Sequence, residues 1–378
     1  MTRLLLSLAA LASCLAVRAV AEPAQPIAIV SEGPYAPAGA QQLVVHSARL
    51  QRDYVVVVSA PPPGPLTAGH KLPAIYALDG GYGVAGPIAQ MMAWAFMMSP
   101  AYVVSIGYPD GHAADRDTDL LHRATVRDGA TIGGGGAAFE AFLESDLRPW
   151  LEARYPLDPN RAILFGHSYG GLFAANVLAD APTSFAGYVI ASPSVFADPQ
   201  LLARLPAAAP KGGGRRVYVA VGGGETANDM VGDAKRIGAA LSAPGSTFVV
   251  QTRIFDGETH ISYFPLLVPA AFGWILPLSA APPPAQPKPI AVAPETLERL
   301  VGVYALEGGR VITVTRQGAK LFAGMTGYPG GEVLAETATR FFAPGLDVQI
   351  DFEIGPAGKA SAVVAHVNGA VIRAVRKS

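Results

Sequence analysis

Residues 161–173 have the sequence RAILFGHSYGGLF, and this stretch decides the fold of the chain. Ile163 to Phe165 form an apolar run that predicts a buried strand, and a helical pattern follows from Gly170. Between them lies G-x-S-x-G, which in this context forms a sharp turn that lifts the serine hydroxyl above the sheet edge. We therefore predict that Ser168 is a nucleophile and that the N–H group of Tyr169 stabilises an oxyanion. The alternative is a glycine-rich turn with a chance serine.

Strand and helix patterns alternate on both sides of this turn. The predicted strands cover residues 42–50, 53–59, 74–78, 102–106, 162–165, 188–191, 217–221 and 248–255. The predicted helices cover residues 139–155, 170–178 and 227–241. This alternation predicts an α/β fold with a mainly parallel sheet and helices on both faces.

The pattern changes after Leu278. Residues 279–294 (SAAPPPAQPKPIAVAP) are rich in proline and alanine and predict a semi-rigid linker. Beyond them, alternating strands separated by glycine-rich turns predict a small antiparallel β domain, either a barrel or a sandwich. The predicted domains are therefore an α/β domain at 22–278, a linker at 279–294 and an all-β domain at 295–378.

A serine nucleophile needs a histidine base within hydrogen-bond reach. Only His260 and His366 follow Ser168 in the sequence. His366 lies in an alternating strand of the β domain, where a structural role is expected. His260 follows the last predicted strand of the sheet, at the same sheet edge as the turn with Ser168, and we predict that it is the base. His167, next to the nucleophile, is expected to point away and to be structural.

The acid that orients the histidine is expected one strand earlier, where Glu225 follows the strand at 217–221. The sequence leaves Asp229, Asp233 and Glu258 open as alternatives. The oxyanion site needs a second N–H group. The loop Asp79-Gly80-Gly81-Tyr82 follows the first parallel strand, so we predict Gly81 as this donor with Tyr82 next, and Tyr82 as a substrate-binding residue.

Composition excludes several classes of protein. The 378 residues carry a formal net charge of −1, which argues against nucleic-acid binding. A single cysteine excludes a disulfide framework and a cysteine-ligated metal centre. The sequence also lacks metal-ligand spacings such as H-x-x-x-H, so no metal and no cofactor is predicted.

The first 21 residues predict a signal peptide, with Arg3, an apolar run and an A-x-A cleavage site at Ala19-Val20-Ala21. The expected location is periplasmic or secreted. Leu11-Ala12-Ser13-Cys14 also resembles a bacterial lipoprotein cleavage site, so a lipid anchor on Cys14 is the alternative. No membrane span is predicted, because the apolar run is too short.

Five stretches together resemble the esterase D and enterochelin esterase type of α/β-hydrolase. They are LDGG at 78–81, FEAFLESDLRPWLEARY at 139–155, GHSYGGLF at 166–173, SPSVF at 192–196 and GETHISYFP at 257–265. The resemblance covers about residues 40–278. It implies a serine esterase in which Ser168 is the nucleophile, His260 the base, and Gly81 and Tyr169 the oxyanion donors. The acid varies in the siderophore branch, so the resemblance leaves Glu225 open.

The resemblance implies substrates such as siderophore trilactones, S-formylglutathione, or acyl and feruloyl esters of sugars. The tail from Leu300 onward is similar to the small β domain found after secreted serine hydrolases of the penicillin-binding type, although the S-x-x-K motif of that class is absent. The leading hypothesis is a secreted serine esterase for a small-molecule ester, with siderophore trilactones as the first candidate. The alternatives are a carbohydrate esterase, a prolyl-oligopeptidase-like peptidase, and a non-catalytic binding protein.

Overall fold

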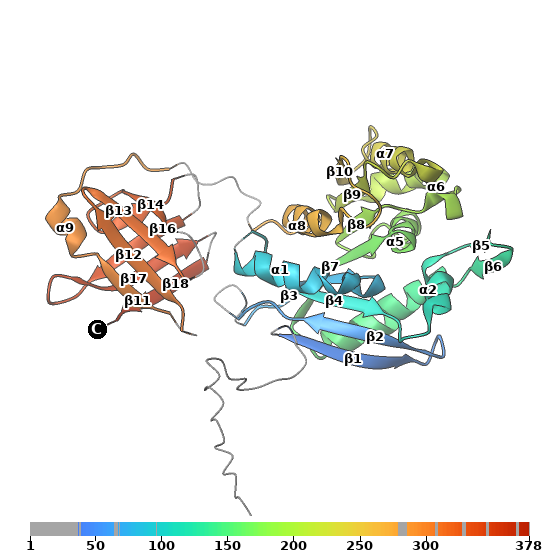
Figure 1. Ribbon diagram of the computed structural model, residues 1–378, viewed down its shortest axis with the longest axis horizontal. Coiled ribbons are helices and arrows are strands. Elements are labelled where there is room, and N and C mark those ends of the chain that lie inside the picture. The colour runs from blue at the N-terminus through green and yellow to red at the C-terminus, as the bar shows by residue number, and fades with distance from the viewer. Residues whose placement is uncertain are drawn as a thin grey trace, which may run out of the picture. The chain divides into compact units, whose positions relative to one another are not determined.

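The computed structural model describes residues 37–377 except 38, 64–66, 68, 96, 279–285, 307–308, 327–329, 345–347 and 368–369 (Figure 1). The predicted signal peptide and Cys14 lie outside the described residues, as does the first part of the predicted linker. Within the described part of the chain, no helix combines the length and apolar character that crossing a bilayer requires.

An eight-stranded sheet organises the first part of the chain, in the order β1-β2-β4-β3-β7-β8-β9-β10. The strands are β1 (Ala40–Ser47), β2 (Arg52–Ser59), β3 (Leu72–Ala77), β4 (Tyr102–Gly107), β7 (Leu157–His167), β8 (Gly187–Ala191), β9 (Arg216–Gly222) and β10 (Val249–Phe255). The pairs from β4 to β10 are parallel, whereas β2 is antiparallel to both of its neighbours. The predicted α/β fold is confirmed.

Helices cover both faces of this sheet. They are α1 (Ala85–Trp94), α2 (Ala113–Leu120), α3 (Gly136–Ala141), the π-helical segment η2 (Phe142–Leu147), α4 (Arg148–Glu152), α5 (Tyr169–Asp180), α6 (Leu201–Ala208), α7 (Met230–Leu241) and α8 (Phe264–Ile275). Strand residues contribute alternately to two buried clusters: Ile163 packs with residues of α1 and α8, and Leu164 packs with residues of α3 to α7. This period of two is what a strand covered on both faces requires.

The sequence pattern missed two features of this domain that frame the site. A hairpin of β5 (Ala124–Arg127) and β6 (Ala130–Gly133) follows α2. Helix α8 follows the His260 loop and buries Leu267 and Phe272. Proline at Pro269 inside α8 argues against a helix in the sequence, because it removes one backbone donor and crowds the preceding turn. Burial of the surrounding apolar residues outweighs that loss here.

The second sheet is a closed antiparallel barrel, preceded by the short helix α9 (Pro294–Glu298). Its strands are β11 (Gly302–Ala305), β12 (Val311–Gln317), β13 (Lys320–Met325), β14 (Gly331–Ala335), β15 (Arg340–Phe342), β16 (Val348–Ile354), β17 (Ala360–Val367) and β18 (Ala370–Arg376). Its interior is a packed core in which the rings of Tyr304 and Phe341 both contact Phe352. Of the two predicted forms, the barrel is therefore the one observed. His366 lies on β17 and pairs with Asp351 of β16 at 3.2 Å.

Candidate active site

The turn between β7 and α5 holds Ser168 in a strained conformation, with φ 60° and ψ −120°. Two glycines make this turn sterically feasible. A Cβ atom on Gly166 would lie 1.9 Å from the carbonyl oxygen of Gly170, and one on Gly171 would lie 2.3 Å from the carbonyl oxygen of Ala191. The N–H group of Ser168 donates to Ala191 O at 3.0 Å, which ties the turn to β8. Strain of this kind at a non-glycine residue is typical of a functional site.

Glu225 and His260 meet at the ends of β9 and β10. His260 Nδ1 lies 2.5 Å from Glu225 Oε2, and the Glu225 side chain is almost fully buried. Ser192 Oγ and the N–H group of Gly222 donate to the other oxygen, Oε1, at 2.6 and 2.7 Å. Burial raises the pKa of Glu225, but hydrogen bonds from His260, Ser192 and Gly222 outweigh it, so the pKa lies below its usual value. The carboxylate is therefore ionised at neutral pH and holds Nδ1–H of His260.

The other candidate acids point elsewhere. Asp229 and Asp233 both pair with Arg236, at 2.7 and 2.5 Å. Glu258 accepts a hydrogen bond from Ser262 Oγ at 2.5 Å. Of the four carboxylates considered in the sequence, only Glu225 contacts the His260 ring. The geometry thus favours Glu225 as the orienting acid.

Sequence reasoning missed the support behind this carboxylate. Ser192 Oγ receives a hydrogen bond from Tyr263 OH at 2.7 Å, and both side chains are fully buried. Ser192 also has a positive φ of 41°, and in this conformation its hydroxyl donates to Glu225 Oε1. The stretches SPSVF and GETHISYFP, quoted above for the resemblance, contain these two residues, but their contact joins positions 71 residues apart.

The described contacts include no direct hydrogen bond between Ser168 and His260, the predicted nucleophile and base. The His260 ring packs on the ring of His167, the residue before Ser168, with ring centroids 4.5 Å apart. Ser168 Oγ lies 3.4 Å from Ser194 Oγ, and this is its hydrogen-bonding neighbour in the described part of the chain. Catalytic hydrogen bonds in enzymes without substrate are often long and shorten only in the complex. The site thus contains the serine, histidine and carboxylate of a serine hydrolase triad, but the hydrogen bond between Ser168 and His260 is not formed.

The two predicted oxyanion donors, Tyr169 and Gly81, differ in whether their N–H group is already hydrogen-bonded. The N–H group of Tyr169 is the first of helix α5, and none of the described carbonyl groups accepts from it. The N–H group of Gly81, within the 3₁₀ turn η1 (Asp79–Gly83), donates to Leu78 O at 3.0 Å and is not free in this conformation. Its oxyanion role stays a prediction. The turn η1 does border the helix start, since a Cβ atom on Gly170 would lie 3.3 Å from Asp79 Oδ2.

A cavity of about 540 Å³ adjoins this turn, and Asp79, Gly80, Tyr82 and Arg116 are among its lining residues. Arg116 forms a bidentate pair with Asp79 at 2.5 and 2.9 Å, and its guanidinium lies 5.5 Å from the Tyr169 ring centroid. Tyr82 is partly exposed, and its hydroxyl lies 3.0 Å from His167 Nδ1. The predicted substrate-binding residue therefore lies between this cavity and His167.

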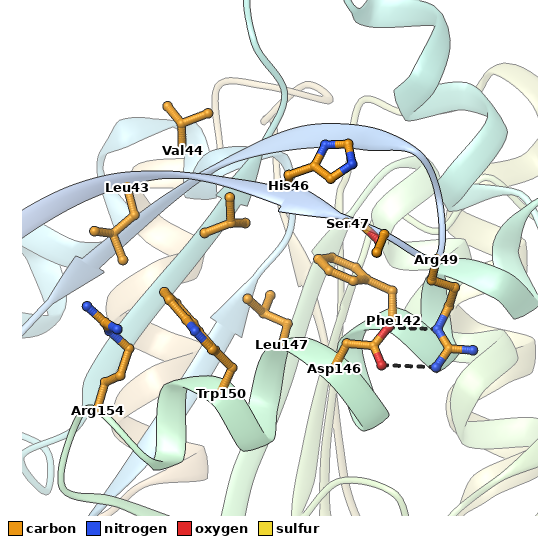
Figure 2. A pocket seen from close by; sticks show the side chains of 12 residues that line it. Leu43, Val44, His46, Ser47, Arg49, Phe142, Asp146, Leu147, Trp150 and Arg154 are labelled. Atoms are coloured by element: carbon orange, nitrogen blue, oxygen red, sulfur yellow. Dashed lines mark hydrogen bonds and ion pairs between the residues drawn. The ribbon is translucent and has the colours of Figure 1, made fainter.

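A second cavity, of about 870 Å³, lies between edge strand β1 and the helical segment η2–α4 (Figure 2). Leu43, Phe142 and Trp150 provide apolar lining, and Arg49 pairs with Asp146 at 2.7 and 2.9 Å beside them. None of the predicted site residues lines this cavity.

Two protein-family models match the chain, one within the sheet domain and one over the barrel. The family model described as "Putative esterase" matches residues 47–263, more than half of the chain. The model described as "Domain of unknown function (DUF3471)" matches residues 286–374, which include strands β11 to β17 and most of β18.

Curated relatives match parts of this chain. The ferri-bacillibactin esterase BesA of Bacillus subtilis (strain 168) is 30% identical over 269 residues, covering 63% of this chain and 90% of the relative. The siderophore triacetylfusarinine C esterase of Aspergillus fumigatus is 37% identical over 141 residues, covering 34% of this chain and 47% of that relative. The siderophore enterobactin esterase of Emericella nidulans is 45% identical over 65 residues, which are 17% of this chain and 22% of that relative.

Solved structures have the same fold. The BES protein from Bacillus cereus aligns with a TM-score of 0.58 and 24% identity, covering 66% of this chain and 99% of that one. The siderophore hydrolase EstB from Aspergillus nidulans aligns with a TM-score of 0.55 and 23% identity, with the same coverage. Together with the family match, these findings place the chain: it belongs to the siderophore esterase-type α/β-hydrolases of the esterase family, and it is a serine esterase with a C-terminal DUF3471 barrel.

Proposed function

We propose that this protein hydrolyses the ester bonds of a siderophore, with a trilactone as the first candidate substrate. The observation that carries this proposal is the contact of His260 with buried Glu225 beside the Ser168 turn. A second support is the activity named for the relatives, which are esterases of ferri-bacillibactin, triacetylfusarinine C and enterobactin.

The proposed reaction has two halves. Ser168 Oγ attacks the ester carbonyl carbon while His260 takes the hydroxyl proton, and Glu225 stabilises the imidazolium that forms. The N–H group of Tyr169 stabilises the oxyanion, and Gly81 joins it if its hydrogen bond to Leu78 opens. Collapse of the tetrahedral intermediate expels the alcohol, which receives the proton from His260.

Water completes the second half. It attacks the acyl-enzyme carbonyl while His260 takes one of its protons. The second tetrahedral intermediate then breaks the bond to Ser168 Oγ, and His260 returns the proton to that oxygen. The products are a carboxylic acid and an alcohol, so one ester bond consumes one water. A trilactone would be opened to a linear trimer first and cut to monomers by further rounds.

A substrate panel tests the proposal. It contains iron-free and ferric trilactones, hydroxamate siderophore esters, feruloyl and acetyl sugar esters, and short peptides, with products identified by liquid chromatography and mass spectrometry. We expect siderophore esters to have the highest kcat/KM and Ser168→Ala to abolish their turnover. Ser361→Ala, a change of an exposed barrel serine, is the matched control.

Other outcomes would redirect the assignment. Preferred cleavage of sugar esters would favour the carbohydrate esterase, and preferred cleavage of peptides the peptidase. Failure of Ser168 to react with a fluorophosphonate probe would point to a non-catalytic binding protein. Full siderophore turnover by Ser168→Ala would contradict the proposal, because the hydroxyl that is proposed to attack the ester is absent from this variant.

We also propose that the mature protein acts outside the cytoplasm. The signal-peptide pattern of residues 1–21 supports this location, and lipidation of Cys14 is the alternative. Expression in a Gram-negative host followed by mass determination of the mature chain distinguishes them. A chain beginning at Glu22 indicates cleavage after Ala21, a diacylglycerol mass on Cys14 indicates the lipoprotein, and an unprocessed chain contradicts both.

A further inference from the structure

His167 occupies a buried position between two of the loops that form the site. It is almost fully buried at the end of β7, and its ring packs against the ring of His260. Its Nε2 atom lies 2.8 Å from the backbone carbonyl oxygen of His260, and its Nδ1 atom lies 3.0 Å from the hydroxyl of Tyr82. Both ring nitrogens are thus engaged, one by main chain and one by a side chain.

The hydrogen-bond partners of His167 determine which of its ring nitrogens carries the proton. A carbonyl oxygen only accepts, so Nε2 must carry the hydrogen and donate it to His260 O. In a neutral ring Nδ1 is then an acceptor, and Tyr82 OH donates to it. Burial raises the pKa of Tyr82 to about 12, which keeps its hydroxyl protonated. Burial and the nearby His260 lower the pKa of His167 to about 3, which keeps the ring neutral.

Several hydrogen bonds hold the His260 loop, both within the loop, such as Thr259 N–H to Ser262 Oγ at 2.8 Å, and to neighbouring segments. The residues on either side, Thr259 and Ile261, are exposed, whereas His260 must present its ring to Ser168 within a fraction of an ångström. The main-chain carbonyl groups of the loop that accept hydrogen bonds include Glu258 O, which accepts from Gly224 N–H at 2.8 Å, and His260 O, which accepts from His167. The second of these bonds acts on the catalytic residue itself.

We propose that His167 and Tyr82 are positioning residues of the proposed esterase. Tyr82 OH donates to Nδ1 of His167 and so fixes its ring orientation, and Nε2–H of His167 holds the main chain of His260 where its ring can reach Ser168. Since Tyr82 lies on η1 and lines the 540 Å³ cavity, the chain of hydrogen bonds joins the predicted oxyanion loop, the nucleophile turn and the base loop. This inference rests on the proposed function, because it concerns the same Ser168 and His260.

Three variants test it on a p-nitrophenyl ester. His167→Phe keeps a ring but loses both hydrogen bonds, so we expect kcat to fall about 100-fold, the scale of a 1 Å misplacement. His167→Gln retains an N–H donor at the position of Nε2 and should recover at least about tenfold of that loss. Tyr82→Phe removes one hydroxyl and should lower kcat about two- to tenfold. For the two His167 variants KM should change little, because the His167 ring is buried and does not line the 540 Å³ cavity.

A matched control and a double variant make the test specific. Tyr155→Phe removes a hydroxyl that donates to Gln41 Oε1 at 2.7 Å, and because neither residue lines the 540 Å³ cavity, kcat should be unchanged. If Tyr82 acts through His167, adding Tyr82→Phe to His167→Phe should cause no further loss. Multiplying losses in the double variant would overturn the proposed chain, as would a kcat for Tyr82→Phe equal to that of Tyr155→Phe.

The controls also separate this inference from the proposed function. Turnover retained by Ser168→Ala means that the serine esterase assignment itself fails. Loss in Ser168→Ala together with wild-type kcat in His167→Phe means that only the positioning role fails. Unfolding midpoints are measured for each variant. If His167→Phe does not fold, the comparison of His167→Gln, Tyr82→Phe and their double variant with wild type carries the test.

Discussion

Glu225 has the contact predicted for it, and the structure adds two further contacts that support it. Its two oxygens receive hydrogen bonds from three groups, and only one of these, His260, was anticipated from the sequence. The other two, Ser192 and Gly222, hold the carboxylate ionised and fixed in orientation. A buried carboxylate supported in this way can stabilise an imidazolium without taking its proton.

Glu225→Gln should therefore lower kcat about 10²- to 10⁴-fold, because a neutral amide no longer stabilises protonated His260. Steady-state turnover of a p-nitrophenyl ester measures this loss. Asp229→Asn, Asp233→Asn and Glu258→Gln are matched controls and should keep near-wild-type kcat, since none of these side chains contacts His260. A larger loss in any of them than in Glu225→Gln would reassign the acid.

His167 makes stability depend on pH. Its pKa is lowered from 6.5 to about 3 in the folded protein, so the unfolded chain binds one more proton between these values. The stabilisation is complete above pH 6.5 and decreases as the pH falls toward 3. From pH 7 to pH 5, wild type should lose about 2 kcal/mol more of its unfolding free energy than His167→Gln loses.

Urea unfolding followed by tryptophan fluorescence measures this difference. Trp94, Trp150 and Trp274 are the tryptophans of the chain, so the signal reports on the α/β domain alone. Glu225 contributes in the same direction at lower pH, because its lowered pKa favours the folded state above its unfolded pKa. An equal pH dependence in wild type and His167→Gln would show that His167 is protonated in the folded protein.

Helix α5 and strand β8 approach so closely that a glycine is required where they cross. Gly171 faces the carbonyl oxygen of Ala191, and this oxygen also accepts the N–H group of Ser168. A side chain at Gly171 would thus press on the same peptide that holds the nucleophile. The close packing of α5 on β8 and the geometry of the Ser168 turn therefore depend on each other.

Gly171→Ala should lower the unfolding free energy by about 1–3 kcal/mol, the usual cost of overpacking, and should reduce ester turnover with it. Gly331→Ala is the matched control, because nothing lies within 4 Å of a Cβ atom at that strand position. Urea unfolding and turnover are measured for both. Wild-type stability in Gly171→Ala would mean that the helix can shift away from β8 without loss.

The hydrophobic cores of the sheet domain and of the barrel are separate. The barrel core of residues 297–374 shares no residue with the two clusters of the sheet domain. The segment from Gln286 precedes the barrel and bonds to it, through the N–H group of Ile290 and Ala335 O. Every predicted site residue lies on the sheet domain.

A chain ending at Leu278 should therefore fold and keep kcat/KM for a p-nitrophenyl ester within about twofold of the full chain, as expected of an independent domain. Its tryptophan fluorescence should show the same unfolding midpoint. Turnover of siderophore esters by the shortened chain is compared in parallel. Aggregation or loss of p-nitrophenyl ester turnover would show that the sheet domain depends on the barrel.

The sequence by itself determined the elements that depend on local patterns. The apolar run before G-x-S-x-G, the alternation of strands and helices, and the change of period after Leu278 each reflect which face of an element is buried. These patterns were sufficient for the α/β sheet, for the Ser168 turn and for an all-β C-terminal part. They missed the short barrel strands β11, β14 and β15, because three to five residues contain too few alternations.

Tertiary structure decided the contacts between distant segments. Ser192 meets Glu225 across 33 residues, and His167 meets His260 across 93. No local pattern encodes such pairs, since they depend on how β7, β8, β9 and β10 align at one sheet edge and on which buried polar groups must be satisfied there. For the same reason the choice of Glu225 over three nearby carboxylates, and the engagement of Gly81 N–H by Leu78, are visible only once the chain is folded.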